Sequence, residues 1–395
     1  MQVVVHIDEP WQQEAVEEIA RRFEASNPGV SVLVKVLPNG EIRSALIAGQ
    51  SDADLVQLFN GDIADCARQG HLLDLRAWLG QNPDLIDLFH PSIFRLAEQE
   101  GSIAVLPLSA TMKGIFYNKR WFDKAGIPYP AAGWTWDDFE KIAIRLQEAN
   151  AAKDAKRFAA RIPFQREYIG LLLLSAGTDW LSPDRSRASG YADSPPAIQA
   201  VQRAADLVRK HRAASATQDT FFNGDILRRE AGMILDYYVM LHEIQPLLQD
   251  DLGIAGLPQF GTGQAANEPW VCGFGISSAT AHPELAFSLL REMTCSANAL
   301  TLLVTDGSIA ALRAAYEEVG HDQDPLCNAV LAELANSAPL PISPANGLFR
   351  LLDEAVDAAL GRILFEGADV KETLDELAVA LDVKLQANAS APILG

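Results

Sequence analysis

The first 60 residues alternate between strand and helix patterns, and this alternation restricts the possible folds more than any other feature of the sequence. A β-branched run at residues 3–7 is followed by residues 14–23, where apolar side chains recur at the i, i+3, i+4 and i+7 spacing of a helix. Alternating valines at 30–36 predict a second strand, and a helix over about 41–48 and a strand over 54–58 follow. This order predicts a mainly parallel sheet with helices on its faces, and ligand binding beyond the carboxyl ends of the strands.

Polar and aromatic side chains follow each of these three strands. Aromatic faces can stack on the apolar side of a sugar ring, and carboxylates and amides can bind its hydroxyl groups. A lone tryptophan at the start of a helix can equally staple the helix cap to the core, but three such loops together favour a binding site. The candidate residues are Glu9, Trp11, Arg43, Phe59, Asn60 and Asp62.

Residues 106–146 predict a passage of the chain from one lobe into another. Pro107 prevents a helix at the start of this segment, and residues 114–117 form a short apolar run that ends in polar residues, as a buried strand does at a surface. Thr135 and Asp138 have the spacing of a capping box, so a helix is expected to begin there. Its buried stripe is expected to consist of Phe139, Ile142, Ala143 and Leu146.

Three motifs in this segment carry a resemblance to a known family. They are Tyr-Asn-Lys at 117–119, Phe-Asp-Lys-Ala-Gly-Ile-Pro at 122–128 and Trp-Thr-Trp-Asp-Asp-Phe at 134–139. Together they resemble the hallmark of the family 1 extracellular solute-binding proteins, which are substrate receptors of bacterial ABC importers for sugars and related solutes. The resemblance implies an α/β, two-lobe periplasmic-binding-protein-like fold of type II, with mainly parallel sheets and three hinge crossings. The expected boundaries are 1–108 and 271–311 for lobe 1, and 109–270 and 312–395 for lobe 2.

The resemblance also adds candidate ligand-binding residues at the crossings and in the second lobe. Some precede an apolar helix at 169–176, whose positive N-terminus favours a solute oxygen. Others end the strand at 232–238 and resemble an element whose closing aromatic residue stacks on the ligand, although no tryptophan is present; these tyrosines could instead anchor a helix start. The set is Thr111, Gln165, Tyr168, Asp236, Tyr237, Tyr238, Trp270, Gly273 and Arg350.

Composition excludes several classes of partner. The formal net charge of −20 would repel nucleic acid and anionic lipid headgroups, and no stretch approaches the roughly 18 consecutive apolar residues of a membrane span. The length of 395 residues predicts two or three domains. A neutral solute is favoured, unless two of the basic residues Arg43, Lys113, Arg166 and Arg350 converge, in which case an anionic sugar derivative becomes the better expectation.

No catalytic, metal or cofactor signature is found. The seven histidines lack metal-ligand spacing, the glycine-rich stretch at 253–270 lacks the lysine and hydroxyl residue of a P-loop, and no Gly-x-Ser-x-Gly elbow occurs. The four cysteines show no Cys-x-x-Cys spacing and are expected to be buried thiols rather than a disulfide framework. The alternative to a solute receptor is a secreted carbohydrate-active enzyme on an α/β scaffold, and a receptor for a partner protein is a third possibility.

The resemblance further implies a function, partners and a location. The protein is expected to capture a carbohydrate or sugar-derived solute in an interlobe cleft by hinge closure and to deliver it to the permease subunits of the transporter. A monomer is expected, in the periplasm or as a cell-surface lipoprotein. Because the sequence opens directly into a strand, the resemblance implies that a signal peptide has been removed.

Overall fold

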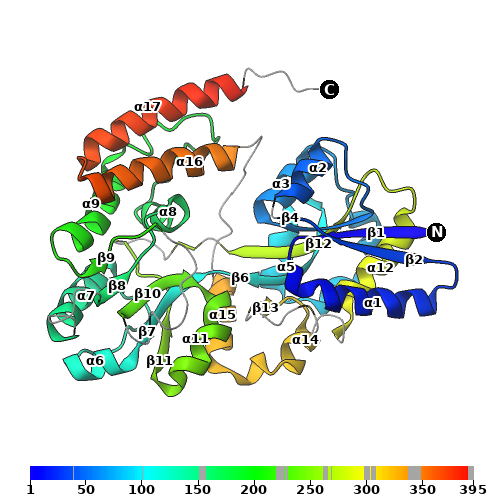
Figure 1. Cartoon of the computed structure of the whole chain (residues 1–395), viewed down its shortest axis with the longest axis horizontal. Helices are drawn as coiled ribbons and strands as arrows, with labels where there is room; N and C mark the ends of the chain where they lie inside the picture. Colours follow the sequence, from blue (N-terminus) through cyan, green and yellow to red (C-terminus); the bar gives the residue numbers. More distant parts are fainter. Residues whose placement is uncertain are drawn as a thin grey trace. The chain divides into compact units, whose positions relative to one another are not determined.

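The structure is a computed structural model. It describes residues 1–38, 40–99, 101–150, 157–218, 227, 230–260, 266–267, 269–297, 303, 308–336 and 348–389. The chain divides into two compact units: Met1–Met112 with Pro269–Ala345 (unit 1), and Lys113–Glu268 with Asn346–Gly395 (unit 2). Each unit is built on its own sheet flanked by helices (Figure 1), so the expected α/β class and two-part organisation are confirmed.

Unit 1 contains a six-stranded sheet in the order β13-β6-β12-β3-β1-β2. Its strands are β1 (Gln2–Ile7), β2 (Ser31–Val36), β3 (Leu55–Phe59), β6 (Val105–Thr111), β12 (Trp270–Ile276) and β13 (Ile309–Ala310). A separate pair joins β4 (Glu98–Gln99) to β5 (Ser102–Ile103). The residues of β1 from Val3 to Ile7 are all buried, which is the pattern of a strand covered on both faces.

Helices cover both faces of this sheet. They are α1 (Gln13–Ser26), α2 (Glu41–Ile47), α3 (Asn60–Arg68), α4 (Arg76–Gln81), α5 (Pro91–Ala97), α12 (Pro283–Cys295), α14 (Arg313–Glu318) and α15 (Pro325–Asn336), with the 3₁₀ turns η1 (Pro10–Gln12), η2 (Pro83–Leu88) and η5 (His321–Gln323). In α1 the expected stripe is buried, namely Val16, Ile19, Ala20 and Phe23. Figure 1 shows α1 and α12 together on one side of the strands and α2 with α3 on the other.

Unit 2 contains a five-stranded sheet in the order β11-β7-β10-β8-β9. Its strands are β7 (Lys113–Asn118), β8 (Phe158–Arg161), β9 (Ala214–Ser215), β10 (Ala231–Tyr237) and β11 (Leu252–Ala255). Its helices are α6 (Lys119–Ala125), α7 (Trp136–Asn150), α8 (Arg166–Ser175), α9 (Pro195–Arg209), α11 (Leu241–Leu248), α16 (Leu348–Gly361) and α17 (Val370–Ala389), with η3 (Tyr238–Met240), η4 (Gln249–Asp251) and the π-helical turn η7 (Arg362–Glu366). In Figure 1, α16 and α17 run beside each other, and α16 also packs on α8.

The capping box at the start of α7 forms as the sequence predicts. The Thr135 hydroxyl accepts a hydrogen bond from Asp138 N at 3.2 Å, and the Asp138 carboxylate accepts one from Thr135 N at 2.9 Å. Of the expected stripe, Phe139, Ala143 and Leu146 are buried, and Ile142 is half-buried.

The strand directions differ from the expected mainly parallel arrangement. β1, β2 and β3 pair in parallel, but β12 runs antiparallel to both β3 and β6, and β7 runs antiparallel to both β10 and β11. The unit 1 sheet is mixed because the chain leaves this unit at the end of β6 and returns beside that end. Thr111 pairs with Trp270, so the returning strand must run in the opposite direction.

The expected boundary of the third crossing also needs correction. Residues 312–336 pack in unit 1 rather than with the C-terminal helices: Arg313 Nε donates to Phe89 O at 3.0 Å, and Arg95 Nη2 donates to Leu334 O at 3.0 Å. The third passage therefore lies between residues 336 and 348, outside the described part of the chain. The first two divisions fall at 112/113 and 268/269, within a few residues of the expected positions.

All four cysteines are free thiols, as expected. Cys66, Cys272 and Cys327 are buried and Cys295 is half-buried. Burial raises the pKa of Cys66 and Cys327 to about 12, which keeps these thiols protonated and unreactive. Within the described residues, no helix combines the length and apolar character needed to span a membrane.

Candidate functional site

One edge of the unit 1 sheet gathers most of the residues that the sequence singled out there. β1 and β3 are parallel and end at this edge, β6 also ends there, and β12 begins there, since Phe59 pairs with Cys272 and Thr111 with Trp270. The segments that follow β1 and β3 therefore meet the start of β12, as the strand order predicts for a ligand-binding edge.

The segment after β1 presents an acid and an aromatic ring to solvent. Trp11 is 43% exposed, and its indole Nε1 donates to Glu9 Oε2 at 2.7 Å. Glu9 and Trp11 thus form a hydrogen-bonded pair of an acid and an aromatic ring just before α1. Phe59 and Trp270 form an aromatic pair at this edge, with ring centroids 6.4 Å apart.

A carboxyl group in the same segment has a strongly perturbed pKa. Burial raises the pKa of Asp8 to about 7, and the negative charges of Glu9 and Asp62 act in the same direction. Asp8 Oδ1 is buried, and no described group forms a hydrogen bond with it. Asp8 therefore changes charge near neutral pH, and Glu9 and Asp62 lie near enough to influence it.

The guanidinium of Arg43 is bound by carboxylates of α3. Its Nη2 lies 2.5 Å from Asp65 Oδ2, and its Nε lies 3.4 Å from Asp62 Oδ1. Because Asp65 is buried, this ion pair fixes α2 against α3. Asp62 is only half-buried and remains accessible at the edge.

Packing accounts for one predicted residue of unit 1, and a second is only partly described. Gly273 lies inside β12, and a Cβ there would stand 2.7 Å from Leu106 O, so the glycine is required by the close approach of β6. Asn60 begins α3, but its side chain lies outside the described part of the structure.

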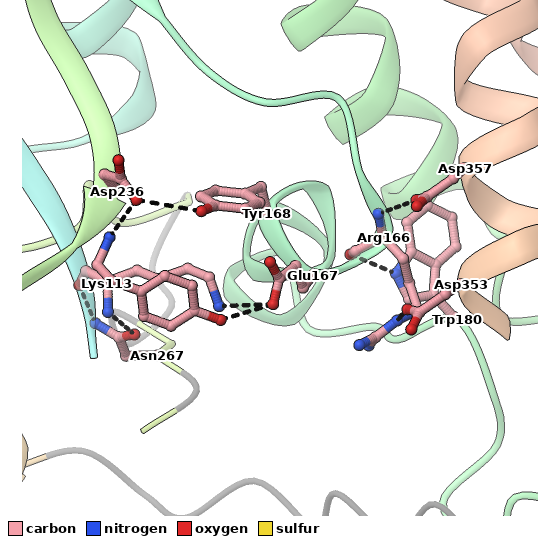
Figure 2. Close-up of polar contacts among 10 residues, drawn as sticks. Lys113, Arg166, Glu167, Tyr168, Trp180, Asp236, Asn267, Asp353 and Asp357 are labelled. Atoms are coloured by element: carbon pink, nitrogen blue, oxygen red, sulfur yellow. Dashed lines mark hydrogen bonds and ion pairs between the residues drawn. The ribbon is translucent and has the colours of Figure 1, made fainter. Parts of the chain in front are cut away.

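The second cluster lies in unit 2, where β7 begins and β10 ends (Figure 2). Lys113 is fully buried, and its ammonium lies 3.4 Å from Glu167 Oε2. The same carboxylate oxygen accepts a 2.6 Å hydrogen bond from the Tyr237 hydroxyl. The Lys113 Nζ also lies 4.0 Å from the ring centroid of Tyr237 and 5.2 Å from that of Tyr168. Two aromatic faces and one carboxylate thus surround the ammonium.

These contacts decide the charge state of Glu167. Burial opposes its ionisation, but the positive charge of Lys113 and the hydrogen bond from Tyr237 outweigh burial and lower its pKa. Glu167 is therefore an ionised carboxylate at the first turn of α8. Among the described residues, none donates a hydrogen bond to its other oxygen, Oε1.

Asp236 and Tyr168 are two further fully buried residues of this cluster. The Asp236 carboxylate accepts hydrogen bonds from Tyr237 N at 2.7 Å and from the Tyr168 hydroxyl at 3.3 Å. Both side chains are fully buried, and burial raises the pKa of the Tyr168 hydroxyl, which stays a donor. The hydrogen bond from Tyr237 N joins this buried pair to Tyr237.

The backbone of Lys113 is fixed by a single amide side chain. Asn267 Oδ1 accepts from Lys113 N at 3.2 Å, and Asn267 Nδ2 donates to Lys113 O at 2.6 Å (Figure 2). Lys113 is the first residue of unit 2, and Asn267 lies near the end of the same stretch of chain, residues 113–268. The two hydrogen bonds therefore connect the two ends of this stretch.

Three predicted residues of unit 2 lie outside this cluster or are only partly described. Tyr238 is buried and donates to Ala255 O at 3.2 Å, and a Cβ on Gly114 would stand 2.1 Å from its hydroxyl. Gln165 is the N-terminal flanking residue of α8 and makes no side-chain cap. Arg350 lies in α16, and its side chain is outside the described part of the structure.

Arg166, beside Glu167, is held by α16. Its Nε forms an ion pair with Asp353, and its backbone N donates to Asp357 Oδ1 at 2.6 Å (Figure 2). Burial raises the pKa of Asp357 to about 6, although the hydrogen bond from Arg166 N opposes this. The first turn of α8 is thereby anchored to the C-terminal helices of the unit.

Several residues of these clusters are absent from the candidate set that the sequence supports. They are Asp8, Lys113, Glu167 and Asn267. The sequence marks Lys113 only as a nearby basic residue. Glu167 directly precedes the candidate Tyr168, and the acid in the first turn of a helix is the signal that could have found it. Asn267 has no recognisable pattern, because its role depends on a distant strand.

Comparison with known proteins places the chain in a family. The sequence profile of the bacterial extracellular solute-binding proteins matches residues 6–299, which is most of the chain. The chain belongs to this family. The family resemblance seen in the sequence is therefore confirmed, and the extracellular character that the family name states applies to this chain.

Curated relatives match over part of their length. A binding protein of Brucella abortus (strain 2308) is 26% identical over 189 residues, which cover 47% of this chain and 44% of that protein. The multiple sugar-binding protein of Streptococcus mutans is 24% identical over 144 residues, which cover 35% and 31%. The chain thus spans less than half the length of these relatives.

Solved structures match over nearly the whole chain. UgpB of Mycobacterium tuberculosis in complex with glycerophosphocholine is similar with a TM-score of 0.80 at 18% identity, covering 98% of this chain and 99% of that one. The sugar-binding protein MalE of Xanthomonas citri has a TM-score of 0.80 at 16% identity, covering 98% of each. An ABC substrate-binding protein of Listeria monocytogenes in complex with cycloalternan has a TM-score of 0.78 at 18% identity, covering 98% and 99%. These likenesses establish the two-domain fold.

Proposed function

We propose that this protein is the substrate-binding component of an ABC importer and that it captures a neutral, hydroxyl-rich solute of the carbohydrate class. The observation that carries the chemical class is the pairing of the cations in both clusters. Arg43 is bound by Asp65 and Asp62, and Lys113 by Glu167. Arg166 is likewise bound by Asp353. An anionic solute would have to compete with carboxylates already in place.

The groups that face solvent favour hydroxyl donors. In unit 1, Glu9 and Asp62 are half-buried acceptors, Trp11 lies beside Glu9, and Phe59 and Trp270 form an aromatic pair at the same edge of the sheet. In unit 2, Glu167 supplies an ionised carboxylate with one oxygen to which no described residue donates. Carboxylates beside aromatic faces suit sugar rings, which offer both hydroxyl donors and apolar faces. The multiple sugar-binding protein and MalE among the similar proteins agree with this class.

The remaining expectations belong to the same proposal. The solute is captured by hinge closure, which shifts the population toward a closed form that the permease subunits recognise. The protein acts as a monomer in the periplasm or as a lipoprotein at the cell surface, and it binds rather than converts its solute.

A melting-temperature screen tests the solute class. Neutral oligosaccharides, polyols, uronic acids and glycerophosphodiesters are compared at equal concentration, and a neutral sugar is expected to raise the melting temperature most. A solute at 100 times its Kd stabilises the folded state by about 2.7 kcal/mol. Chromatography of the incubated sugars distinguishes a receptor from an enzyme. Turnover, or stabilisation by the acidic solutes alone, would refute the proposal.

A paired substitution tests the site. Trp11→Ala removes an exposed ring beside Glu9 and is expected to weaken binding of the stabilising sugar at least tenfold, with little change in the melting temperature of the free protein. Leu33→Ala is the matched control, because Leu33 is a similarly exposed (40%) apolar residue of unit 1 on β2. Equal effects of the two substitutions on affinity would exclude Trp11 from the site.

A further inference from the structure

We propose that Gln57 is the positioning residue of the segment formed by residues 9–11: its buried side-chain amide fastens the chain on both sides of that segment. The consequence for solute affinity rests on the proposed function, but the positioning itself does not. Gln57 lies in β3, two residues before the strand ends, and is only 1% exposed. No part of it can reach a solute, so any effect it has on binding must act through its neighbours.

The two ends of the amide hold two different points of the chain. On one side, Gln57 Oε1 accepts a hydrogen bond from Asp8 N at 3.3 Å. On the other, Gln57 Nε2 donates to Gln12 Oε1 at 2.6 Å. Asp8 ends the run that leaves β1, and Gln12 is the last residue of η1. The segment that presents Glu9 and Trp11 lies between these two attachments.

A second layer of contacts fixes the orientation of this amide. Gln57 Nε2 also lies 3.4 Å from Cys272 Sγ on β12, and Gln12 Nε2 donates to Leu303 O at 2.9 Å. Rotating the Gln57 amide by half a turn would place its Nε2 against another donor, Asp8 N, and its Oε1 against another acceptor, Gln12 Oε1. Leaving either group unpaired in a buried network costs about 1–3 kcal/mol, so the network has one favourable arrangement.

The core itself does not require a glutamine at this position. Leu55, which lies on the same face of β3 as Gln57, is a fully buried apolar residue, so an apolar side chain is compatible with this face of the sheet. The reason for an amide at this position is its pair of hydrogen bonds to Asp8 and Gln12, which flank the segment. Within the segment, Trp11 Nε1 donates to Glu9 Oε2 at 2.7 Å and Gln12 N donates to Glu9 O at 3.0 Å.

The test uses the whole protein without solute, labelled with 5-fluorotryptophan. The ¹⁹F line of Trp11 is assigned by its loss in Trp11→Phe. In Gln57→Leu this line is expected to shift and broaden, whereas the line of Trp78, which stacks on Phe287 elsewhere in unit 1, stays in place. Gln12→Leu removes one of the two attachments and should move the Trp11 line in the same direction by a smaller amount.

A matched control separates positioning from general stability. Thr294→Val removes a buried hydrogen bond to Leu290 O in α12 and should lower the melting temperature without moving the Trp11 line. If Gln57→Leu behaves like this control, Gln57 is only a structural residue and the inference is wrong. If Gln57→Leu does not fold, the Gln12→Leu spectrum decides in the same way.

Maltotetraose serves as the binding probe in a separate titration. The Gln57→Leu protein is expected to bind it at least tenfold more weakly than the unsubstituted protein. Lack of maltotetraose binding by the unsubstituted protein would count against the proposed solute class, whereas the ¹⁹F result would still support or overturn the positioning role.

Discussion

The pKa of Asp8 leads to a quantitative prediction about stability and pH. Folding raises this pKa from 3.8 to about 7, mainly through burial. Below about pH 4 the carboxyl is protonated in both the folded and the unfolded chain, so it contributes no penalty. As the pH rises from about 4 to about 7, the unfolded chain loses this proton before the folded chain does, and the free energy of unfolding falls. Above pH 7 the penalty is complete and constant.

The size of the penalty follows from the shift. Each unit by which a pKa is raised corresponds to 1.36 kcal/mol, so raising this pKa from 3.8 to about 7 lowers the free energy of unfolding by at most about 4 kcal/mol. Because Asp8 is only half-buried, solvent screening reduces this to about 1–2 kcal/mol. For a domain of this size, that is a change of about 3–6 °C in melting temperature.

Replacing the carboxyl by an amide removes this penalty. Asp8→Asn is expected to raise the melting temperature by about 3–6 °C at pH 8 and to leave it unchanged near pH 4. The measurement is a series of calorimetric scans between pH 4 and pH 8.5 without solute. The control is Asp84→Asn, which removes the same charge from an exposed position of η2. A gain that is equal at all pH values, or a loss at pH 8, would refute the reasoning.

Two further substitutions test the packing of unit 2. Lys113→Met leaves the Glu167 carboxylate without the ammonium it pairs with and should lower the free energy of unfolding in urea by about 3–5 kcal/mol. Adding Glu167→Gln should recover part of this loss. A double variant no more stable than Lys113→Met would contradict the pairing. Gly114→Ala places a Cβ 2.1 Å from the Tyr238 hydroxyl and should lower the free energy of unfolding by about 1–3 kcal/mol. The control is Gly80→Ala in α4, where the space is open, and it should be neutral or slightly stabilising. Similar urea midpoints for the two variants would contradict the close approach of Tyr238 to Gly114.

Local features of the fold could be predicted because their causes are local. The capping box of Thr135 and Asp138 depends on residues three positions apart, and the buried face of α1 depends on helical periodicity. Both are properties of a few consecutive residues. The direction of β12 has no local cause, because it is set by where the chain re-enters unit 1.

The same distinction applies to the candidate site. The acid and aromatic residues after β1 could be found because they follow a recognisable strand. The sequence points to Tyr168 rather than Glu167 because adjacent residues of a helix differ by about 100° in direction, and nothing in the pattern says which one faces the strand edge. Asn267 and Gln57 act on backbone atoms of Lys113 and Asp8, which are far from them in the sequence.

The place of β12 in its sheet affects how the protein is made. This strand lies between β6 and β3, so β6 has no neighbour on that side until residues 270–276 have left the ribosome. Residues 113–268, which build unit 2, are synthesised first. At about 5–20 residues per second this interval lasts roughly 8–30 s. During that time the apolar strands β3 and β6 present unpaired edges, to which a strand of another chain could pair.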